Sequence, residues 1–216
     1  MAETLPIVRP GKRAIVSGRT GSGKSTLACW LLNRTRQHWV ILNPKWTAAY
    51  KELPESEVIT RFDESKVNQS IDKNRFTIIN FDGKTANAEY MDEVISFIHS
   101  RYENIGICAD ELFTLHTGGR PGAGLTSWLT QGRELKQTFI GLTQRPAWIS
   151  RFCFSEADYI IGMDLSLKED RKRLHENSGC PYFEGRIEPR KWLFYDVNAD
   201  SISKYGAVPL LKSQTR

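Results

Sequence analysis

An α/β fold, with a mostly parallel central sheet and helices on both faces, is the class that this sequence predicts. Short apolar runs of strand length recur along the chain, and segments with helically spaced apolar residues separate them. Such alternation is typical of a parallel sheet whose two faces are both buried. The chain has 216 residues, of which 40% are hydrophobic, and this is enough to build the core of one such domain.

The first expected strand is "RAIVSG" (Arg13–Gly18), which follows a polar arm over Met1–Lys12. Later segments share its run of consecutive apolar residues, a pattern that indicates a buried strand. These further predicted strands are Trp39–Pro44, Arg75–Phe81, Asn104–Phe113, Thr138–Gln144, Asp158–Leu165 and Lys191–Val197.

Helices are expected between these strands. One begins at about Lys24, directly after a glycine-rich turn, and another covers Ala88–Glu103, where apolar residues recur with helical spacing. The remaining predicted helices cover about Leu125 to Lys136 and Ser166–Asn177. The Gly/Pro-rich stretch His116–Gly124 follows a core strand, which is a usual place for a functional loop.

The turn between the first strand and the first helix fits the motif G-x-x-x-x-G-K-[ST] at every fixed position. Glycines allow backbone angles closed to other residues and let amide groups approach phosphate oxygens. The helix N-terminus adds partial positive charge, Lys24 adds a full charge at the β- and γ-phosphates, and Ser25 offers its hydroxyl to Mg²⁺. A plain glycine turn is the simpler interpretation, but the position between a strand and a helix favours a nucleotide site.

The sequence therefore predicts a P-loop NTPase with ATP and Mg²⁺ as cofactors. The predicted nucleotide-binding residues are Gly18, Arg19, Thr20, Gly21, Ser22, Gly23, Lys24, Ser25 and Thr26.

A second acidic position is expected on a neighbouring strand, because a P-loop alone does not hold the magnesium ion. The segment "IGICADEL" supplies Asp110 and Glu111 after an apolar run. We expect Asp110 to bind Mg²⁺, together with Ser25, and Glu111 to act as the general base for the attacking water. The pair could instead merely terminate a strand at the solvent. In combination with the P-loop, the pair favours hydrolysis over phosphoryl transfer to a second substrate. A kinase uses the acceptor group of that substrate and needs no activated water.

Three segments then occur in one order: "GRTGSGKST", "ICADELF" and "QGRELKQTFIGLTQRP". Together they resemble the FtsK/HerA superfamily of DNA-pumping ATPases over about Arg13 to Pro146. The compact length resembles the virus-encoded branch, the small genome-packaging ATPases of icosahedral viruses with internal membranes. We expect one domain over residues 1–216, with a RecA-like catalytic core over about 13–165, C-terminal elements over 166–205 and a tail over 206–216.

The resemblance implies further roles. Gln144 corresponds to the polar sensor of the γ-phosphate, and Arg133 to an arginine finger that reaches the nucleotide of a neighbouring subunit. Arg145 is a rival finger, and Arg19 within the loop could also reach phosphate. The charged link Glu134–Gln137 departs from the Gly-rich approach of many relatives and weakens the alignment of Arg133.

The implied function is ATP-driven translocation of double-stranded DNA by a ring, expected to be a hexamer, that packages a viral genome. Portal or vertex proteins are expected partners, and the host cytoplasm or the packaging vertex of the virion is the expected location. A plasmid-transfer or filamentous-phage secretion ATPase, a small-molecule kinase and a non-catalytic nucleotide-binding protein are the alternatives. Membrane-spanning segments or added domains are frequent in the first of these, whereas "LTQRP" has no role in a kinase.

Charge and composition are compatible with this function. The net charge is +5 with a pI near 9.0, which favours a polyanionic partner without requiring one. The four cysteines lack C-x-x-C spacing, so reduced thiols in a cytosolic compartment are expected. The four histidines show no metal-ligand spacing. No signal peptide or membrane-length apolar stretch is recognised. The candidate DNA contacts are the loop His116–Gly124, with Arg120, and the stretch Lys45–Lys51.

Overall fold

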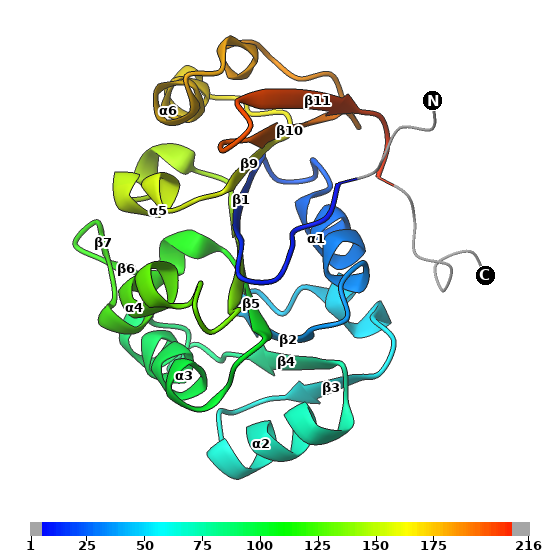
Figure 1. Cartoon of the computed structure of the whole chain (residues 1–216), viewed down its shortest axis with the longest axis vertical. Coiled ribbons are helices and arrows are strands. Elements are labelled where there is room, and N and C mark those ends of the chain that lie inside the picture. The colour runs from blue at the N-terminus through cyan, green and yellow to red at the C-terminus, as the bar shows by residue number, and fades with distance from the viewer. Residues whose placement is uncertain (1–5, 209–216) are drawn as a thin grey trace.

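The computed structural model describes residues 6–208, and a nine-stranded sheet forms the centre of this part of the chain (Figure 1). The strand order is β11-β10-β9-β1-β8-β5-β2-β4-β3. The strands from β9 to β3 in this order run parallel, whereas β10 and β11 form an antiparallel hairpin at one edge. The predicted fold class, mostly parallel α/β with helices on both faces, is therefore confirmed.

The strands of the sheet are β1 (Arg13–Ser17), β2 (His38–Asn43), β3 (Ser56–Ile59), β4 (Phe76–Asn80), β5 (Ile105–Asp110), β8 (Thr138–Thr143), β9 (Tyr159–Gly162), β10 (Trp192–Asp196) and β11 (Ser201–Tyr205). A separate small hairpin consists of β6 (His116–Thr117) and β7 (Arg120–Pro121). The α-helices are α1 (Lys24–Asn33), α2 (Glu64–Lys73), α3 (Ala88–Arg101), α4 (Ala123–Gln131), α5 (Arg151–Ser155) and α6 (Lys168–Ser178). Short 3₁₀ turns cover Ala48–Glu52, Leu112–Leu115, Pro146–Trp148 and Pro181–Phe183.

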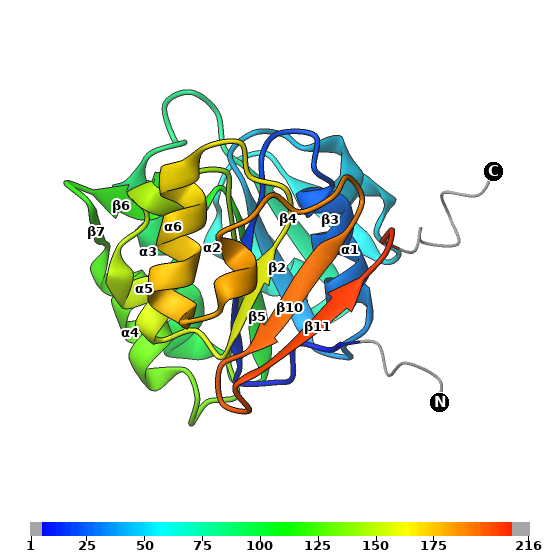
Figure 2. The same cartoon turned by 90° about the horizontal axis from the view of Figure 1, so that it is seen from above.

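The two faces of the sheet carry separate apolar clusters. The face covered by α1 buries side chains from α1 and from alternate positions of β1, β2 and β8, including Leu31, Val16 and Ile41. The opposite face packs against α3 and α4, through residues such as Ile95 and Trp128. Figure 2 shows α5 and α6 on one side of the strands and α1 on the other. Because both faces are buried, the strands read as continuous apolar runs.

Local sequence explains how several helices begin and end. The Asp63 side chain accepts a hydrogen bond from the Lys66 amide at the start of α2, and Asn87 caps α3 in the same way through Tyr90. Helix α6 ends at Gly179, whose φ of 69° few residues other than glycine adopt readily.

Several elements were not predicted, and three of them, β3, β11 and α2, have a weak apolar pattern. Strand β3 lies at one edge of the sheet and β11 at the other, and both carry polar residues at several positions. Helix α2 buries only Val67 and Ser70. Edge strands and solvated helices lack the burial on two sides that makes the inner strands recognisable.

Three predicted elements extended too far, and one of them, the strand over Asp158–Leu165, covers only Tyr159–Gly162. The expected strand over Asn104–Phe113 ends at Asp110, because Glu111 adopts a left-handed conformation with φ of 103°. The expected helix up to Lys136 ends at Gln131, and the chain turns at Gly132 before β8 begins. The predicted tail over 206–216 lies outside the described residues beyond Val208.

No helix in the described range has the length and apolar character needed to cross a membrane. The four cysteines are free thiols, and all four are buried.

Candidate active site

The parallel strands place their carboxyl ends along one edge of the sheet, and the P-loop lies there between β1 and α1. Three backbone contacts fix its path: the Gly18 amide donates to the Thr143 carbonyl at 3.1 Å, the Arg19 amide to Asp164 at 2.8 Å and the Ser22 amide to Arg19 at 3.2 Å. Gly21 and Gly23 have φ values of 75° and 97°, which is the left-handed region that favours glycine. The predicted loop therefore has the backbone that a phosphate cradle requires.

Lys24 begins helix α1 and lies inside this cradle. Its ammonium group is largely buried and donates a hydrogen bond of 3.1 Å to the carbonyl of Arg19. Burial lowers the pKa of Lys24 to about 8, partly opposed by the nearby carboxylates of Glu111 and Asp110. A buried cation with few fixed partners is suited to bind an anionic ligand such as a triphosphate.

Asp110 ends β5, and its carboxylate is buried beside the loop that follows β2. The Thr47 hydroxyl donates a 2.5 Å hydrogen bond to Asp110 Oδ2. Burial raises the pKa of this carboxyl group, and the hydrogen bond from Thr47 opposes the shift. A desolvated carboxylate near the Ser25 hydroxyl offers oxygen ligands of the kind that Mg²⁺ prefers, with nucleotide phosphates completing the coordination shell. These two residues therefore fit a magnesium ion.

Glu111 follows Asp110 and has an unusual backbone conformation. Its φ of 103° and ψ of 77° are unusual for a residue with a side chain, and such backbone strain occurs often at functional sites. The carbonyl of Glu111 accepts hydrogen bonds from both the amide and the hydroxyl of Thr114. These bonds hold the turn that aims the carboxylate at the P-loop.

The Gln144 side chain connects Glu111 to the P-loop. Its amide nitrogen donates to Glu111 Oε2 at 3.1 Å, and its amide oxygen accepts a hydrogen bond from the Thr20 hydroxyl. Gln144 directly follows β8, which lies between β1 and β5 in the sheet. The strand order thus brings the ends of three strands together at this point.

These side chains surround one open cavity of about 420 Å³. Its lining residues are Thr20, Gly21, Gly23, Lys24, Ser25, Thr26, Lys45, Thr47, Asp110, Glu111, Leu142 and Gln144. Three distant segments of the sequence therefore meet in this cavity and supply Lys24 and Ser25, Asp110 and Glu111, and Gln144.

Lys45 is a site residue that the sequence did not reveal. It was a candidate DNA contact, but its ammonium group forms an ion pair with Glu111 Oε2 inside the cavity. Lys45 lies two residues after β2, and β2 is the neighbour of β5 on the side away from β8. Only the strand order could have revealed this proximity, since the segment around Lys45 matches no motif.

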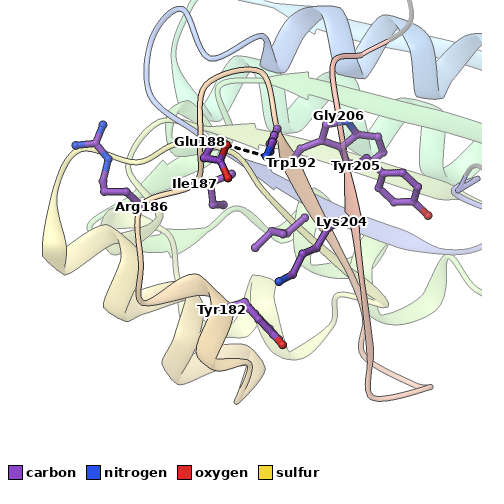
Figure 3. Close-up of a pocket in the computed structure, with 10 residues that line it drawn as sticks. Tyr182, Arg186, Ile187, Glu188, Trp192, Lys204, Tyr205 and Gly206 are labelled. Carbon is purple, nitrogen blue, oxygen red and sulfur yellow. Dashed lines mark ion pairs between the residues drawn. The ribbon is translucent and has the colours of Figure 1, made fainter.

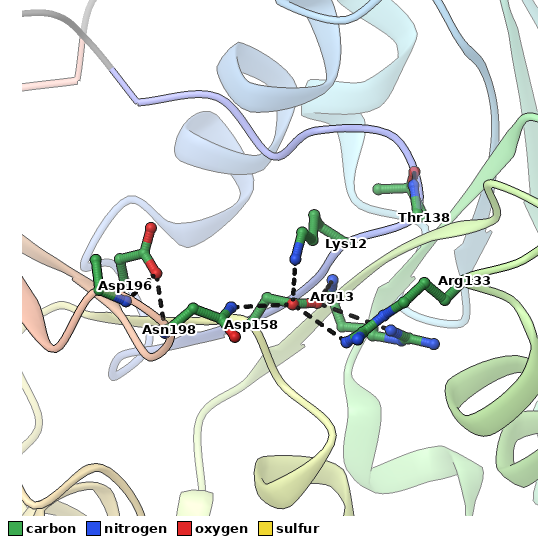
Figure 4. Close-up of polar contacts among 9 residues, drawn as sticks. Lys12, Arg13, Arg133, Thr138, Asp158, Asp196 and Asn198 are labelled. Atoms are coloured by element: carbon green, nitrogen blue, oxygen red, sulfur yellow. Dashed lines mark hydrogen bonds and ion pairs between the residues drawn. The ribbon is translucent and has the colours of Figure 1, made fainter.

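Arg133 is not brought to this cavity. It precedes β8 and lies at the amino edge of the sheet, where its guanidinium is 3.4 Å from Asp158 Oδ1 (Figure 4). Strand β8 has six residues and lies between Arg133 and Gln144, so the two residues are separated by a distance on the order of 20 Å. Lys12 and Arg13 also contact the buried Asp158. The Arg133 side chain is 58% exposed, and it does not line the cavity that contains Lys24.

Arg145 lies at the same edge of the sheet as the P-loop, but its guanidinium already has partners within the protein. Its guanidinium donates a 2.9 Å hydrogen bond to the buried Asp170, pairs with Glu169 and lies 4.2 Å from the centroid of the Trp148 ring. Asp170 also accepts a hydrogen bond from the Ala147 amide. Arg145 therefore links the segment after Gln144 to the start of α6.

Arg19 points away from the phosphate cradle. Its side chain donates to Asp164 Oδ2 at 2.8 Å, and Arg186 makes two further hydrogen bonds of 2.5 and 2.6 Å to the same carboxylate. The hydrogen bonds from Arg186, reinforced by Arg19, lower the pKa of Asp164 to about 2. Arg19 thus ties the P-loop to the segment that precedes β10.

Comparison with known proteins gives a consistent result. No protein-family profile matches the chain. A curated relative, the DNA packaging ATPase P9 of Enterobacteria phage PRD1, is 30% identical over 172 residues, which cover 78% of this chain and 71% of P9.

Solved structures with the same fold include the genome packaging NTPase B204 of Sulfolobus turreted icosahedral virus 2 in complex with ATP-gammaS. Its TM-score is 0.74 at 14% identity, over 93% of this chain and 99% of B204. EssC (ATPases 2 and 3) of Geobacillus thermodenitrificans aligns over 93% of this chain and 40% of its own, with a TM-score of 0.62 at 14% identity.

Proposed function

The chain belongs to the family of viral DNA-packaging ATPases that includes P9 of phage PRD1, and from this premise we propose that it hydrolyses ATP to move double-stranded DNA into a viral capsid. The observation that carries the proposal is the single cavity in which Lys24, Asp110, Glu111 and Gln144 meet. A non-catalytic nucleotide-binding protein would not need a strained carboxylate aimed at the cradle.

Each of these residues has a role in the proposed hydrolysis. The P-loop amides and Lys24 hold the β- and γ-phosphates, and Ser25 and Asp110 hold Mg²⁺. When bound, the metal neutralises phosphate charge and orients the γ-phosphoryl group. Glu111 accepts a proton from the attacking water, and Gln144 donates to the γ-phosphate or to that water. Lys45 adds a second lysine close to the reacting groups.

The proposal includes a ring, expected to be a hexamer, in which a second subunit completes each site. Arg133 is exposed at the opposite edge of the sheet, which suits a finger that acts on a neighbouring subunit. The exposed Arg120 in the β6–β7 hairpin remains a candidate contact for the DNA backbone. Such a motor would work at the packaging vertex, within the host cytoplasm or the virion, and would dock to a portal or vertex protein.

The family relationship to P9 favours genome packaging over the alternatives of conjugative transfer or secretion. The proposed base Glu111 favours hydrolysis over a kinase reaction, in which the acceptor hydroxyl replaces water.

Phosphate release from Mg-ATP tests the hydrolytic site. Wild type should hydrolyse ATP, and more rapidly with long double-stranded DNA. The Glu111→Gln variant should lose at least about 100-fold in kcat while it still binds ATP, because a general base contributes 10²–10⁴-fold. Glu103→Gln, an exposed glutamate near the other end of β5, is the matched control. Hydrolysis by Glu111→Gln at the wild-type rate would refute the assigned base.

A further inference from the structure

A second cavity adjoins the P-loop and has no role in the mechanism above. Its volume is about 480 Å³, and its lining residues are Gly21, Ser22, Gly23, Thr26, Met163, Arg190, Ala207 and Val208. It shares Gly21, Gly23 and Thr26 with the cavity that contains Glu111. The two cavities therefore meet at the P-loop and at the first turn of α1.

The inner wall of this second cavity is Met163, which follows β9. Its amide donates a 2.8 Å hydrogen bond to the Ser17 carbonyl, and its sulfur lies 3.9 Å from the Ser22 hydroxyl. A Cβ atom added at Gly18 would lie 2.9 Å from the Met163 Cβ, and one at Gly23 would lie 3.4 Å from its methyl carbon. Met163 thus lies directly against the glycines of the loop and presents a soft apolar surface.

The outer wall comes from the open end of the β10–β11 hairpin. Trp192 opens β10 and pairs with Tyr205, the last residue of β11, and their rings stack at 4.5 Å (Figure 3). Arg190 lies two residues before this pair and Ala207 two residues after it, so both leave the hairpin at the same end. The hairpin therefore holds Arg190 and the segment Gly206–Val208 beside the P-loop.

Two further observations indicate that the position of Arg190 relative to the P-loop is fixed. Its φ of 63° is in the left-handed region, which is unfavourable for a residue with a side chain and is frequent at binding sites. The Arg186 side chain, shown in Figure 3, anchors the same segment to Asp164, which also binds Arg19 of the P-loop. The ion pairs thus fix the position of this segment relative to the phosphate cradle.

From this arrangement we propose that the second cavity binds the ribose and base of the nucleotide, with Arg190, Met163 and Val208 as the contacts to the base. The inference rests on the proposed function in that the first cavity must hold the triphosphate. A triphosphate in the P-loop then directs its nucleoside past Thr26, which lines both cavities. A planar base suits the guanidinium of Arg190 and the apolar side chains of Met163 and Val208.

The composition of the lining also predicts the base specificity. The described side chains that line this cavity include no acid and no amide, whose oxygens could accept a hydrogen bond from the amino group of adenine. Strong discrimination requires a buried group that is left unpaired by the wrong base. ATP and GTP should therefore bind with affinities within about tenfold of each other.

Equilibrium binding of ATP, GTP and inorganic tripolyphosphate, each with Mg²⁺, tests this site. Arg190→Ala should weaken ATP and GTP by about 5- to 30-fold, the value of a cation–π contact of about 1–2 kcal/mol, and leave tripolyphosphate unchanged. Lys191→Ala, which removes the neighbouring exposed lysine, is the matched control and should change none of the three.

Other outcomes overturn the proposal. Equal weakening of ATP and tripolyphosphate would show that Arg190 acts on the phosphates, and unchanged ATP binding would place the base elsewhere. Affinities of ATP and GTP that differ by more than about tenfold would refute the specificity argument. A protein that binds ATP as described but fails to hydrolyse it would refute the proposed function and leave the base site intact.

Discussion

At the scale of single residues, two donors hold the Glu111 carboxylate. Lys45 and Gln144 both contact its Oε2 atom, and Gln144 is itself held by Thr20. We expect the γ-phosphate of ATP to attract Lys45 and Gln144, which can both donate hydrogen bonds to its oxygens.

The Lys45 contact gives a first prediction. Lys45→Ala should lower kcat/KM for ATP by about 10- to 100-fold, since a contact with a charged group contributes about 1.5–3 kcal/mol, and Lys45→Arg should retain more activity than Lys45→Ala. Lys51→Ala removes an exposed lysine from the following 3₁₀ turn and should leave kcat/KM for ATP unchanged when no DNA is present. Equal activity of Lys45→Ala and wild type would exclude Lys45 from the reaction.

The sequence predicted some of these residues and missed others for a physical reason. Lys24 and Ser25 belong to a motif whose backbone geometry is local, so the spacing alone identifies them. Asp110 ends an apolar strand, and Gln144 follows one and took its expected role from the resemblance to the FtsK/HerA superfamily. Lys45 has no such pattern, and its position depends on the pairing of β2 with β5, which no local sequence feature encodes.

At the scale of secondary structure, the site depends on the alignment of β5 with its neighbours. Gly106 of β5 faces Trp39 of β2, and a Cβ atom added there would lie 2.4 Å from the Trp39 ring. The buried Trp39 ring cannot move away easily, since its Nε1 donates a 2.7 Å hydrogen bond to Thr35. The close approach therefore requires glycine at this position.

Gly106→Ala should consequently lower the free energy of unfolding by about 1–3 kcal/mol, the usual effect of overpacking a core. Chemical denaturation measures this value. Gly83→Ala is the matched control, because an added Cβ there meets no atom within 4 Å. A Gly106→Ala protein as stable as the control would contradict the described packing of β2 against β5.

The sequence predicted the inner strands of the sheet better than its edges. Strands β1, β5 and β8 are buried on both faces and read as apolar runs. The edge strand β11 was missed because its outer positions are solvated. The end of the β10–β11 hairpin, which places Arg190 beside the P-loop, was missed for the same reason. Most residues of the P-loop cavity were therefore recognisable from sequence, whereas the lining of the second cavity was not.

At the scale of the whole molecule, the two candidate fingers lie at opposite edges of the sheet. Arg145 is engaged by Asp170 and Glu169, whereas Arg133 shares Asp158 with Lys12 and Arg13. Asp158 would keep these two cations in an Arg133→Ala variant, so that variant should fold. Arg133 is thus the better candidate for action on a second subunit.

Mixing two inactive variants tests this assignment. Arg133→Ala retains its own Glu111, and Glu111→Gln retains its Arg133, so an equal mixture should form some complete sites. If each site takes its finger from one neighbour in a ring, the mixture should regain roughly a quarter of the wild-type turnover. A mixture no more active than its parts would exclude Arg133, and the same recovery with Arg145→Ala would assign the finger to Arg145.

DNA translocation is the most direct test of the central claim. A third strand bound to a long duplex is displaced when a motor moves along that duplex, and its release can be followed by fluorescence. We predict that wild type with Mg-ATP displaces the third strand, whereas Glu111→Gln binds the duplex and leaves the third strand in place. Hydrolysis of ATP by wild type without any displacement would contradict the account, since the site would then act without moving DNA.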